Sequence, residues 1–109
     1  MYSKKIIVFG SQGFVGSNII NYYSSKKNKL VGIGRKSKLT NNKKLFKNNK
    51  IKIYENDFFD LSLLNKIDFK QSTIIFSAIN GKESKKEYII KVRKLIEYLS
   101  NKNISNFIL

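Results

Sequence analysis

The feature that most constrains this chain is a glycine-rich segment close to its N-terminus. Gly10, Gly13 and Gly16 follow a short apolar run, residues 6–9, and precede a segment with helical spacing of apolar side chains. Glycines at this spacing between a strand and a helix predict a cradle for a dinucleotide pyrophosphate. The first allows a sharp turn, the second lets the backbone approach the phosphates, and the third lets the helix pack closely. The helix N-terminus then directs N–H groups and a partial positive charge at the ligand.

The composition is that of one folded domain covering residues 1–109. Hydrophobic residues make up 41% of the chain, which is enough for a core and argues against disorder. There is no cysteine, which excludes disulfides and thiolate metal sites, and no histidine. The absence of histidine removes the commonest metal ligand and the commonest general base. We therefore assign no metal site.

The net charge of +15 admits two interpretations. A basic chain is suited to a polyanion such as nucleic acid. Alternatively, the charge reflects a coding bias, because Lys, Asn and Ile are abundant while Pro, Cys, His and Trp are absent. The lysines are spread along the whole chain and only two basic residues are arginines, which favours coding bias over a dedicated nucleic-acid surface.

The sequence shows no targeting signal. Lys4 and Lys5 precede an apolar run, but this run has four residues, and a signal peptide needs about 7–15. No stretch approaches the roughly 18 apolar residues of a membrane span. We expect a cytoplasmic protein without membrane contact.

Strand-like and helix-like segments alternate along the chain. This alternation predicts an α/β fold of Rossmann type, a three-layer sandwich around a five-stranded parallel sheet in the order 3-2-1-4-5. The ligand is expected at the carboxyl ends of strands 1 and 4. The strands are expected at residues 5–9, 30–34, 51–54, 73–78 and 106–109, and the helices at 14–25, 61–66 and 85–102, with a weak one near 40–47.

Two helices carry more detailed predictions. Asp60 is expected to cap the helix at residues 61–66, since a carboxylate there accepts from unpaired N–H groups. Helical spacing places five apolar side chains on one face of the helix at residues 85–102. They are Tyr88, Val92, Leu95, Ile96 and Leu99. Because the chain stops within the fifth expected strand, we expect an N-terminal fragment of a larger domain, with a complete small domain as the alternative.

A family resemblance emerges from these motifs. Residues 6–17 resemble the opening of extended short-chain dehydrogenases/reductases, the NAD-dependent epimerase/dehydratase group, and Gly13-Phe14-Val15-Gly16-Ser17 is typical of it. Residues 56–61 resemble the family's Gly-Asp-Leu-x-Asp segment, and residues 74–79 resemble its fourth strand. The resemblance covers essentially the whole chain but only the N-terminal, cofactor-binding half of the family's domain. It implies cofactor contacts from Gly10, Gln12, Gly13, Phe14, Val15 and Gly16.

The resemblance implies further contacts with the cofactor. Asp57 would accept from the adenine amino group, and the backbone N–H of Phe58 would bind the adenine ring. The alternative for Asp57 is an aspartate that stabilises a turn. Ala78 and Ile79 would line the cofactor near its ribose, or would simply end a strand.

Arg35 indicates which cofactor the chain prefers. It lies 19 residues after Gly16, where NAD-binding units place an acid that bonds the ribose 2′-hydroxyl. A guanidinium can instead pair with a 2′-phosphate and stack on adenine. We therefore expect NADP, with NAD as a possibility, and a surface arginine without a cofactor role as the alternative.

Catalysis in the resembling family uses a Ser or Thr together with a Tyr-x-x-x-Lys motif. Both would follow the fifth strand, so we assign no catalytic residue. Three chance matches occur on earlier helices and are rejected: Tyr22/Lys26, Tyr23/Lys27 and Tyr98/Lys102. The family also carries an Asn-Val-x-Gly-Thr stretch in its fourth long helix, where this chain has Tyr88-Ile89-Ile90-Lys91-Val92.

The leading hypothesis is therefore the NAD(P)-binding portion of an epimerase, dehydratase or reductase type of oxidoreductase acting on a nucleotide-sugar-like substrate. A non-catalytic NADP-sensing regulator and a basic nucleic-acid-binding module are the alternatives. A dinucleotide is the expected partner, nucleic acid is disfavoured, and an oligomer is compatible with the sequence.

Overall fold

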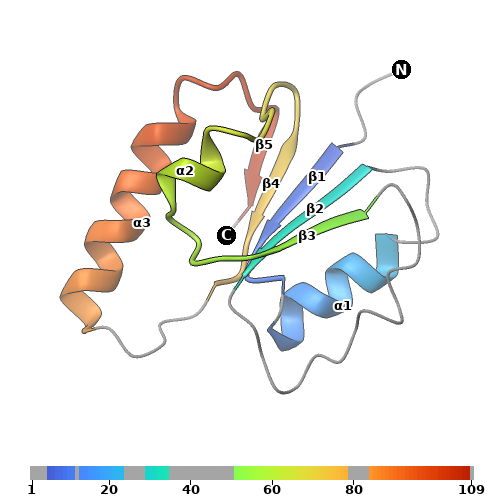
Figure 1. Cartoon of the computed structure of the whole chain (residues 1–109), viewed down its shortest axis with the longest axis horizontal. Helices are drawn as coiled ribbons and strands as arrows, with labels where there is room; N and C mark the ends of the chain where they lie inside the picture. Colours follow the sequence, from blue (N-terminus) through green and yellow to red (C-terminus); the bar gives the residue numbers. More distant parts are fainter. Residues whose placement is uncertain (1–4, 12, 24–28, 35–50, 79–83, 109) are drawn as a thin grey trace.

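The computed structural model describes residues 5–11, 13–23, 29–34, 51–78 and 84–108. The strands within these ranges form one parallel sheet in the order β3-β2-β1-β4-β5, which confirms the predicted topology (Figure 1). The strands are β1 Lys5–Phe9, β2 Lys29–Gly34, β3 Ile51–Glu55, β4 Thr73–Phe76 and β5 Asn106–Ile108. The helices are α1 Phe14–Tyr23, α2 Leu61–Leu64 and α3 Lys85–Leu99.

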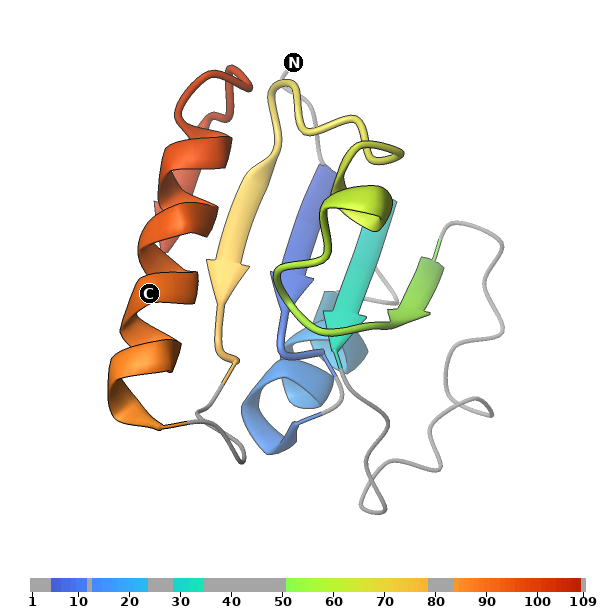
Figure 2. The same cartoon turned by 60° about the vertical axis from the view of Figure 1, so that its left-hand side comes forward.

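The helices cover both faces of the sheet. α1 packs on one face, and α2 and α3 lie on the other, so the three-layer arrangement is confirmed (Figures 1 and 2). β1 lies between β2 and β4, and both neighbours run parallel to it. A parallel pair of strands requires a crossover connection between them. All carboxyl ends of the strands meet at one edge of the sheet (Figure 2).

The two faces of β1 divide the core into two layers. Ile7 and Phe9 pack on the side of α2 and α3, whereas Ile6 and Val8 pack on the side of α1. Successive side chains of a strand point to opposite faces, so an unbroken apolar run fits a strand that is buried on both. Ile20 of α1 completes the second layer.

Several elements end earlier than the sequence predicts. β4 stops at Phe76 instead of residue 78, and the amide of Ser77 still bonds to β1 by donating to the carbonyl of Phe9 (2.8 Å). α3 ends at Leu99 rather than residue 102, and Asn103 adopts a left-handed conformation with φ 55°. The helix expected near residues 40–47 and the last two residues of the helix expected at 14–25 lie outside the described ranges.

Candidate functional site

The glycine-rich segment forms a tight turn at the carboxyl end of β1. Gly10 has a φ of +89°, a conformation that favours glycine, and its amide donates to the carbonyl of Ile33 in β2 (2.6 Å). A Cβ on Gly10 would lie 2.6 Å from the backbone of Ser77 and Ala78. The turn therefore requires glycine, both for its dihedral angle and for the close approach of the β4 end.

Gly16 and Gly13 meet different surroundings. A Cβ on Gly16 would overlap the carbonyl oxygen of Gly10, so the first turn of α1 packs on the loop only because no side chain intervenes. Among the described residues, a Cβ on Gly13 would meet that same oxygen at an ordinary distance of 3.5 Å. Packing within the described residues therefore explains Gly10 and Gly16 but does not explain Gly13.

Ser11, which directly follows Gly10 in this turn, is buried. The residue is 3% exposed, and its Oγ has no hydrogen-bond partner among the described residues. A Cβ on Gly32, in the middle of β2, would lie 2.6 Å from the Ser11 Cβ. Gly32 thus provides the space that Ser11 occupies. The pairing of Ser11 with Gly32 was not predicted from the sequence, although a glycine inside an apolar strand signals a close approach of another group.

The end of β4 lies beside the glycine turn. The Ser77 Oγ donates to the carbonyl of Phe9 (3.1 Å), and the half-buried Ala78 contacts the Gly10 region. The carbonyl of Ala78 accepts from the Tyr88 hydroxyl of α3 (2.6 Å). The structure therefore brings Gly10 and Ala78 together at the carboxyl ends of β1 and β4, where the sequence predicts that the ligand binds.

Asp57 and Phe58 lie in the segment that leads from β3 to α2. This segment crosses the sheet at the level of the strand carboxyl ends, on the side of α3 (Figure 2). The Asp57 carboxylate forms a 2.6 Å ion pair with the Lys91 ammonium of α3. Phe58 is 3% exposed and belongs to the core, so only its backbone is placed to contact a ligand.

Asp60 caps α2, as the sequence predicts. Its carboxylate accepts from the backbone amides of Ser62 (3.1 Å) and Leu63 (3.4 Å), from the Ser62 hydroxyl (2.7 Å) and from the Asn56 side-chain amide (3.1 Å). These bonds, led by that of the Ser62 hydroxyl and then that of Asn56, hold the pKa of Asp60 below its ordinary value.

Comparison with known proteins decides the family. The family model for NAD-dependent epimerases/dehydratases matches residues 6–109. The chain belongs to the NAD-dependent epimerase/dehydratase family. No curated protein sequence gave a match.

Solved structures share the fold of this epimerase/dehydratase family member. A short-chain dehydrogenase/reductase of wide type from Veillonella parvula DSM 2008, in complex with NADP, has a TM-score of 0.74 and 16% identity over 98% of this chain. The Bordetella bronchiseptica enzyme WbmH, in complex with NAD+, has a TM-score of 0.69 and 19% identity over 97% of this chain. This chain covers 46% of the first structure and 38% of the second, less than half the length of each.

The predicted cofactor residues of this family member are described to different extents. Val15 is exposed on the first turn of α1, and Phe14 begins that helix, with its side chain outside the description. Gln12, Arg35 and Ile79 lie outside the described residues. Lys91 could not be identified as a site residue from the sequence, because its position in the helical pattern of α3 gives no sign that it faces Asp57.

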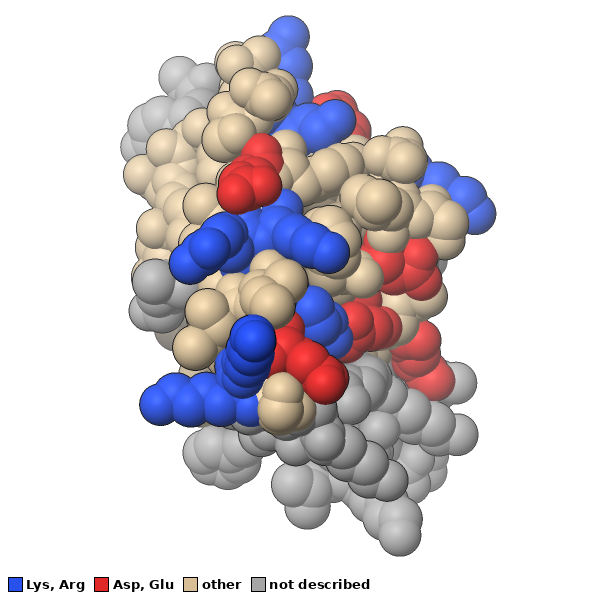
Figure 3. Space-filling view, turned by 90° about the vertical axis from the view of Figure 1, so that its left-hand side faces the viewer, with Lys and Arg blue, Asp and Glu red and all other residues tan. Residues whose placement is uncertain are grey.

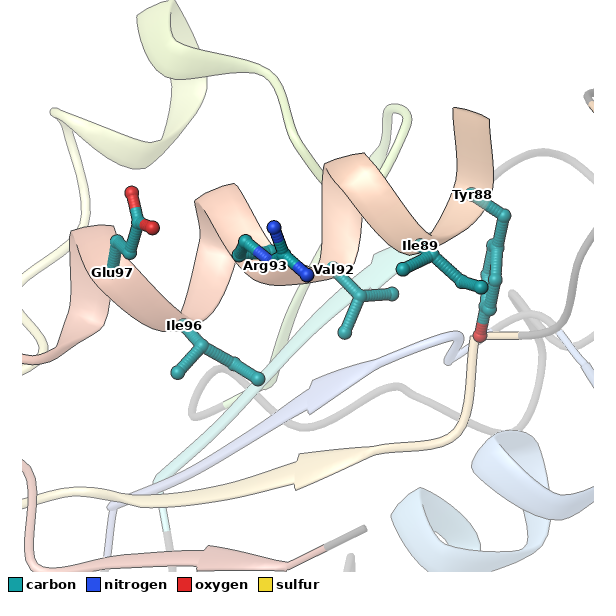
Figure 4. A pocket seen from close by; sticks show the side chains of 6 residues that line it. All are labelled: Tyr88, Ile89, Val92, Arg93, Ile96 and Glu97. Carbon is teal, nitrogen blue, oxygen red and sulfur yellow. The ribbon is translucent and has the colours of Figure 1, made fainter. Parts of the chain in front are cut away.

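An apolar hollow of about 330 Å³ lies along α3, separate from the glycine turn. Figure 4 shows that Val92 and Ile96 point to the same side of the helix, while the Tyr88 hydroxyl points toward the end of β4. Ile96 was predicted to share one face of the helix with Leu95 and Leu99, but it is 45% exposed whereas those two are buried. The hollow is lined by Tyr88, Ile89, Val92, Arg93, Ile96 and Glu97.

The described residues offer neither a metal site nor a membrane-spanning helix. In the described ranges, no His, Cys, Asp and Glu side chains gather in a group of three that would hold a metal ion. None of the helices in the described part of the chain is long and apolar enough to cross a membrane. Tyr98 lies in the last turn of α3, and its hydroxyl donates to Asn65 Oδ1 (2.7 Å).

Proposed function

We propose that this chain is the dinucleotide-binding portion of an epimerase, dehydratase or reductase type of oxidoreductase. The observation that carries the proposal is the contrast among the three glycines of the turn. Gly10 and Gly16 are required by contacts within the fold, whereas no contact among the described residues requires a glycine at position 13. A pyrophosphate that approaches the backbone at Gly13 accounts for its lack of a side chain.

The residues of this chain would bind and orient the dinucleotide. The N-terminus of α1 directs its first N–H groups and its partial positive charge toward the phosphates. Asp57 and the Phe58 amide would hold the adenine, and Ala78 and Ile79 would lie beside a ribose. When bound, the nicotinamide ring accepts or donates a hydride, and we propose a carbon of a nucleotide-sugar-like substrate as its partner.

We further propose that the cofactor is NADP(H). Arg35 directly follows β2, whose carboxyl end lies beside that of β1 in the sheet. No acid occurs between Gly34 and Lys38, and a carboxylate there would repel a 2′-phosphate. A guanidinium at this position can bind the 2′-phosphate through paired hydrogen bonds.

The first experiment is a calorimetric titration of the chain with NADPH and with NADH. We expect the wild type to bind NADPH at least about tenfold more tightly, since a charge-assisted pair with a phosphate contributes about 1.5–3 kcal/mol. Arg35→Ala should abolish this preference. Arg93→Ala, which removes the other arginine of the chain, is the matched control and should keep it. Equal or tighter NADH binding by the wild type contradicts the NADP assignment.

The second candidate, a non-catalytic NADP sensor, is favoured by one departure from the family pattern. Tyr88 stands where the family has the Asn of its Asn-Val-x-Gly-Thr stretch, and its hydroxyl bonds the carbonyl of Ala78 instead (2.6 Å). The gene sequence downstream of Leu109 separates the two candidates. A Ser-Ser or Ser-Thr pair followed by a Tyr-x-x-x-Lys motif indicates an enzyme, and its absence indicates a sensor.

A further inference from the structure

Lys91 connects α3 to the segment between β3 and α2. Its side chain is only 24% exposed, although lysine is seldom buried unless it is paired. The ammonium lies 2.6 Å from Oδ2 of Asp57 and 4.7 Å from the centre of the Phe58 ring. One cation therefore contacts both residues that the proposed function assigns to adenine recognition.

The surface on which the Lys91 ammonium rests is fixed by the core. The buried Phe58 ring packs edge-on against Phe76, with ring centres 5.2 Å apart, and against Tyr88 at 5.9 Å. The Tyr88 hydroxyl is itself held by the carbonyl of Ala78. Because aromatic rings in such contacts have little freedom to move, the position of the ammonium over Phe58 is determined by the fold.

This arrangement restricts the Asp57 carboxylate. The side chain is 34% exposed, and a carboxylate in that setting can rotate unless a partner holds it. A charge-assisted hydrogen bond at 2.6 Å fixes one of its oxygens relative to α3 and Phe58. The positive charge also offsets the repulsion between this carboxylate and an anionic dinucleotide.

The Lys91–Asp57 ion pair joins α3 to the segment between β3 and α2. We propose that Lys91 is a positioning residue that orients Asp57 for recognition of the adenine 6-amino group. This inference rests on the proposed dinucleotide function.

The experiment compares NADPH with its hypoxanthine analogue, in which a 6-oxo group replaces the 6-amino group of adenine. Calorimetric titration gives the ratio of the two dissociation constants for each variant. We expect the wild type to favour NADPH roughly tenfold, because the 6-oxo group of the analogue accepts hydrogen bonds and cannot replace the 6-amino group as a donor to Asp57. Lys91→Met should reduce the ratio to less than about threefold, whereas Lys91→Arg, which keeps the charge, should retain most of it.

Two controls separate positioning from a general structural effect. Lys94→Met changes an exposed lysine on the same helix and should leave the ratio unchanged. In an Asp57→Ala background, Lys91→Met should have no further effect on the ratio, since Lys91 acts through Asp57. A loss of protein stability that weakens the binding of both ligands equally leaves the ratio of their dissociation constants unchanged. Lys91→Gln serves as a second variant if Lys91→Met does not fold.

The outcomes distinguish this inference from the proposed function. The proposed role of Lys91 is overturned if Lys91→Met has the same ratio of dissociation constants as the wild type. An equal loss of affinity of this variant for both ligands has the same meaning. A wild type that binds both ligands equally overturns the inference but leaves dinucleotide binding in place. A wild type that binds neither ligand overturns both.

Discussion

At the scale of single residues, the three glycines of the turn have separate physical reasons. The sequence predicts a sharp turn for Gly10 and close helix packing for Gly16, and both are seen in the structure. The contact made by Gly16 is with the carbonyl of Gly10 in the loop rather than with the strand itself. Ser11 and Gly32 could not be paired from sequence, because they lie on different elements and only the register of β1 and β2 brings them together.

The glycine contrast yields a stability prediction. Gly16→Ala should lower the free energy of unfolding by about 3 kcal/mol, because its Cβ would overlap a backbone oxygen that cannot move away. Gly13→Ala should change the free energy of unfolding by less than about 0.5 kcal/mol, since its Cβ makes an ordinary contact. Urea denaturation of the two variants and the wild type measures both values. Equal destabilisation by the two substitutions would show that this view of the turn is wrong.

At the scale of elements, caps and interior patterns are more predictable from sequence than ends. Asp60 was identified as the cap of α2, because a cap depends on residues a few positions apart. The turn that follows α3 is held by a distant contact, in which the amide of Gln71 donates to the carbonyl of Asn103 (2.8 Å). Helical spacing alone does not reveal that Ile96 is exposed while Leu95 and Leu99 are buried.

The cap of α2 yields a prediction about pH. The pKa of Asp60 in the folded state lies below its ordinary value of 3.8, so its stabilising effect is complete above that value. The effect is lost as the pH falls through the lower folded-state pKa. The difference in Tm between the wild type and Asp60→Asn should therefore be larger at about pH 6 than at about pH 3.

Taking the difference in Tm between the wild type and Asp60→Asn cancels the effect of the other carboxylates on the Tm. Asp68 also has a lowered pKa, owing first to the Lys70 amide and then to Lys5, but it titrates in both proteins. A difference in Tm that stays constant over this range would mean that the Asp60 hydrogen bonds do not stabilise the charged carboxylate.

At the scale of the whole molecule, the strand order followed from the sequence because few arrangements suit alternating strands and helices. The charge of +15 did not fix a function in the same way. Over α3, acidic side chains are interspersed among the lysines and arginines, so this face carries no uniform basic surface (Figure 3). The ion pair between Lys91 and Asp57 belongs to this scale, since it joins two segments that only the completed fold places together.

The central claim is that the turn at Gly10, Gly13 and Gly16 binds the pyrophosphate of a dinucleotide. The most direct measurement is calorimetric titration of NADPH into the wild type and into Gly13→Val, with the Tm of each recorded. A valine at residue 13 should weaken binding at least about tenfold by blocking the approach of the phosphates, while the Tm changes by only a few degrees. Equal NADPH affinity in the two proteins, or no binding by the wild type, would contradict the claim.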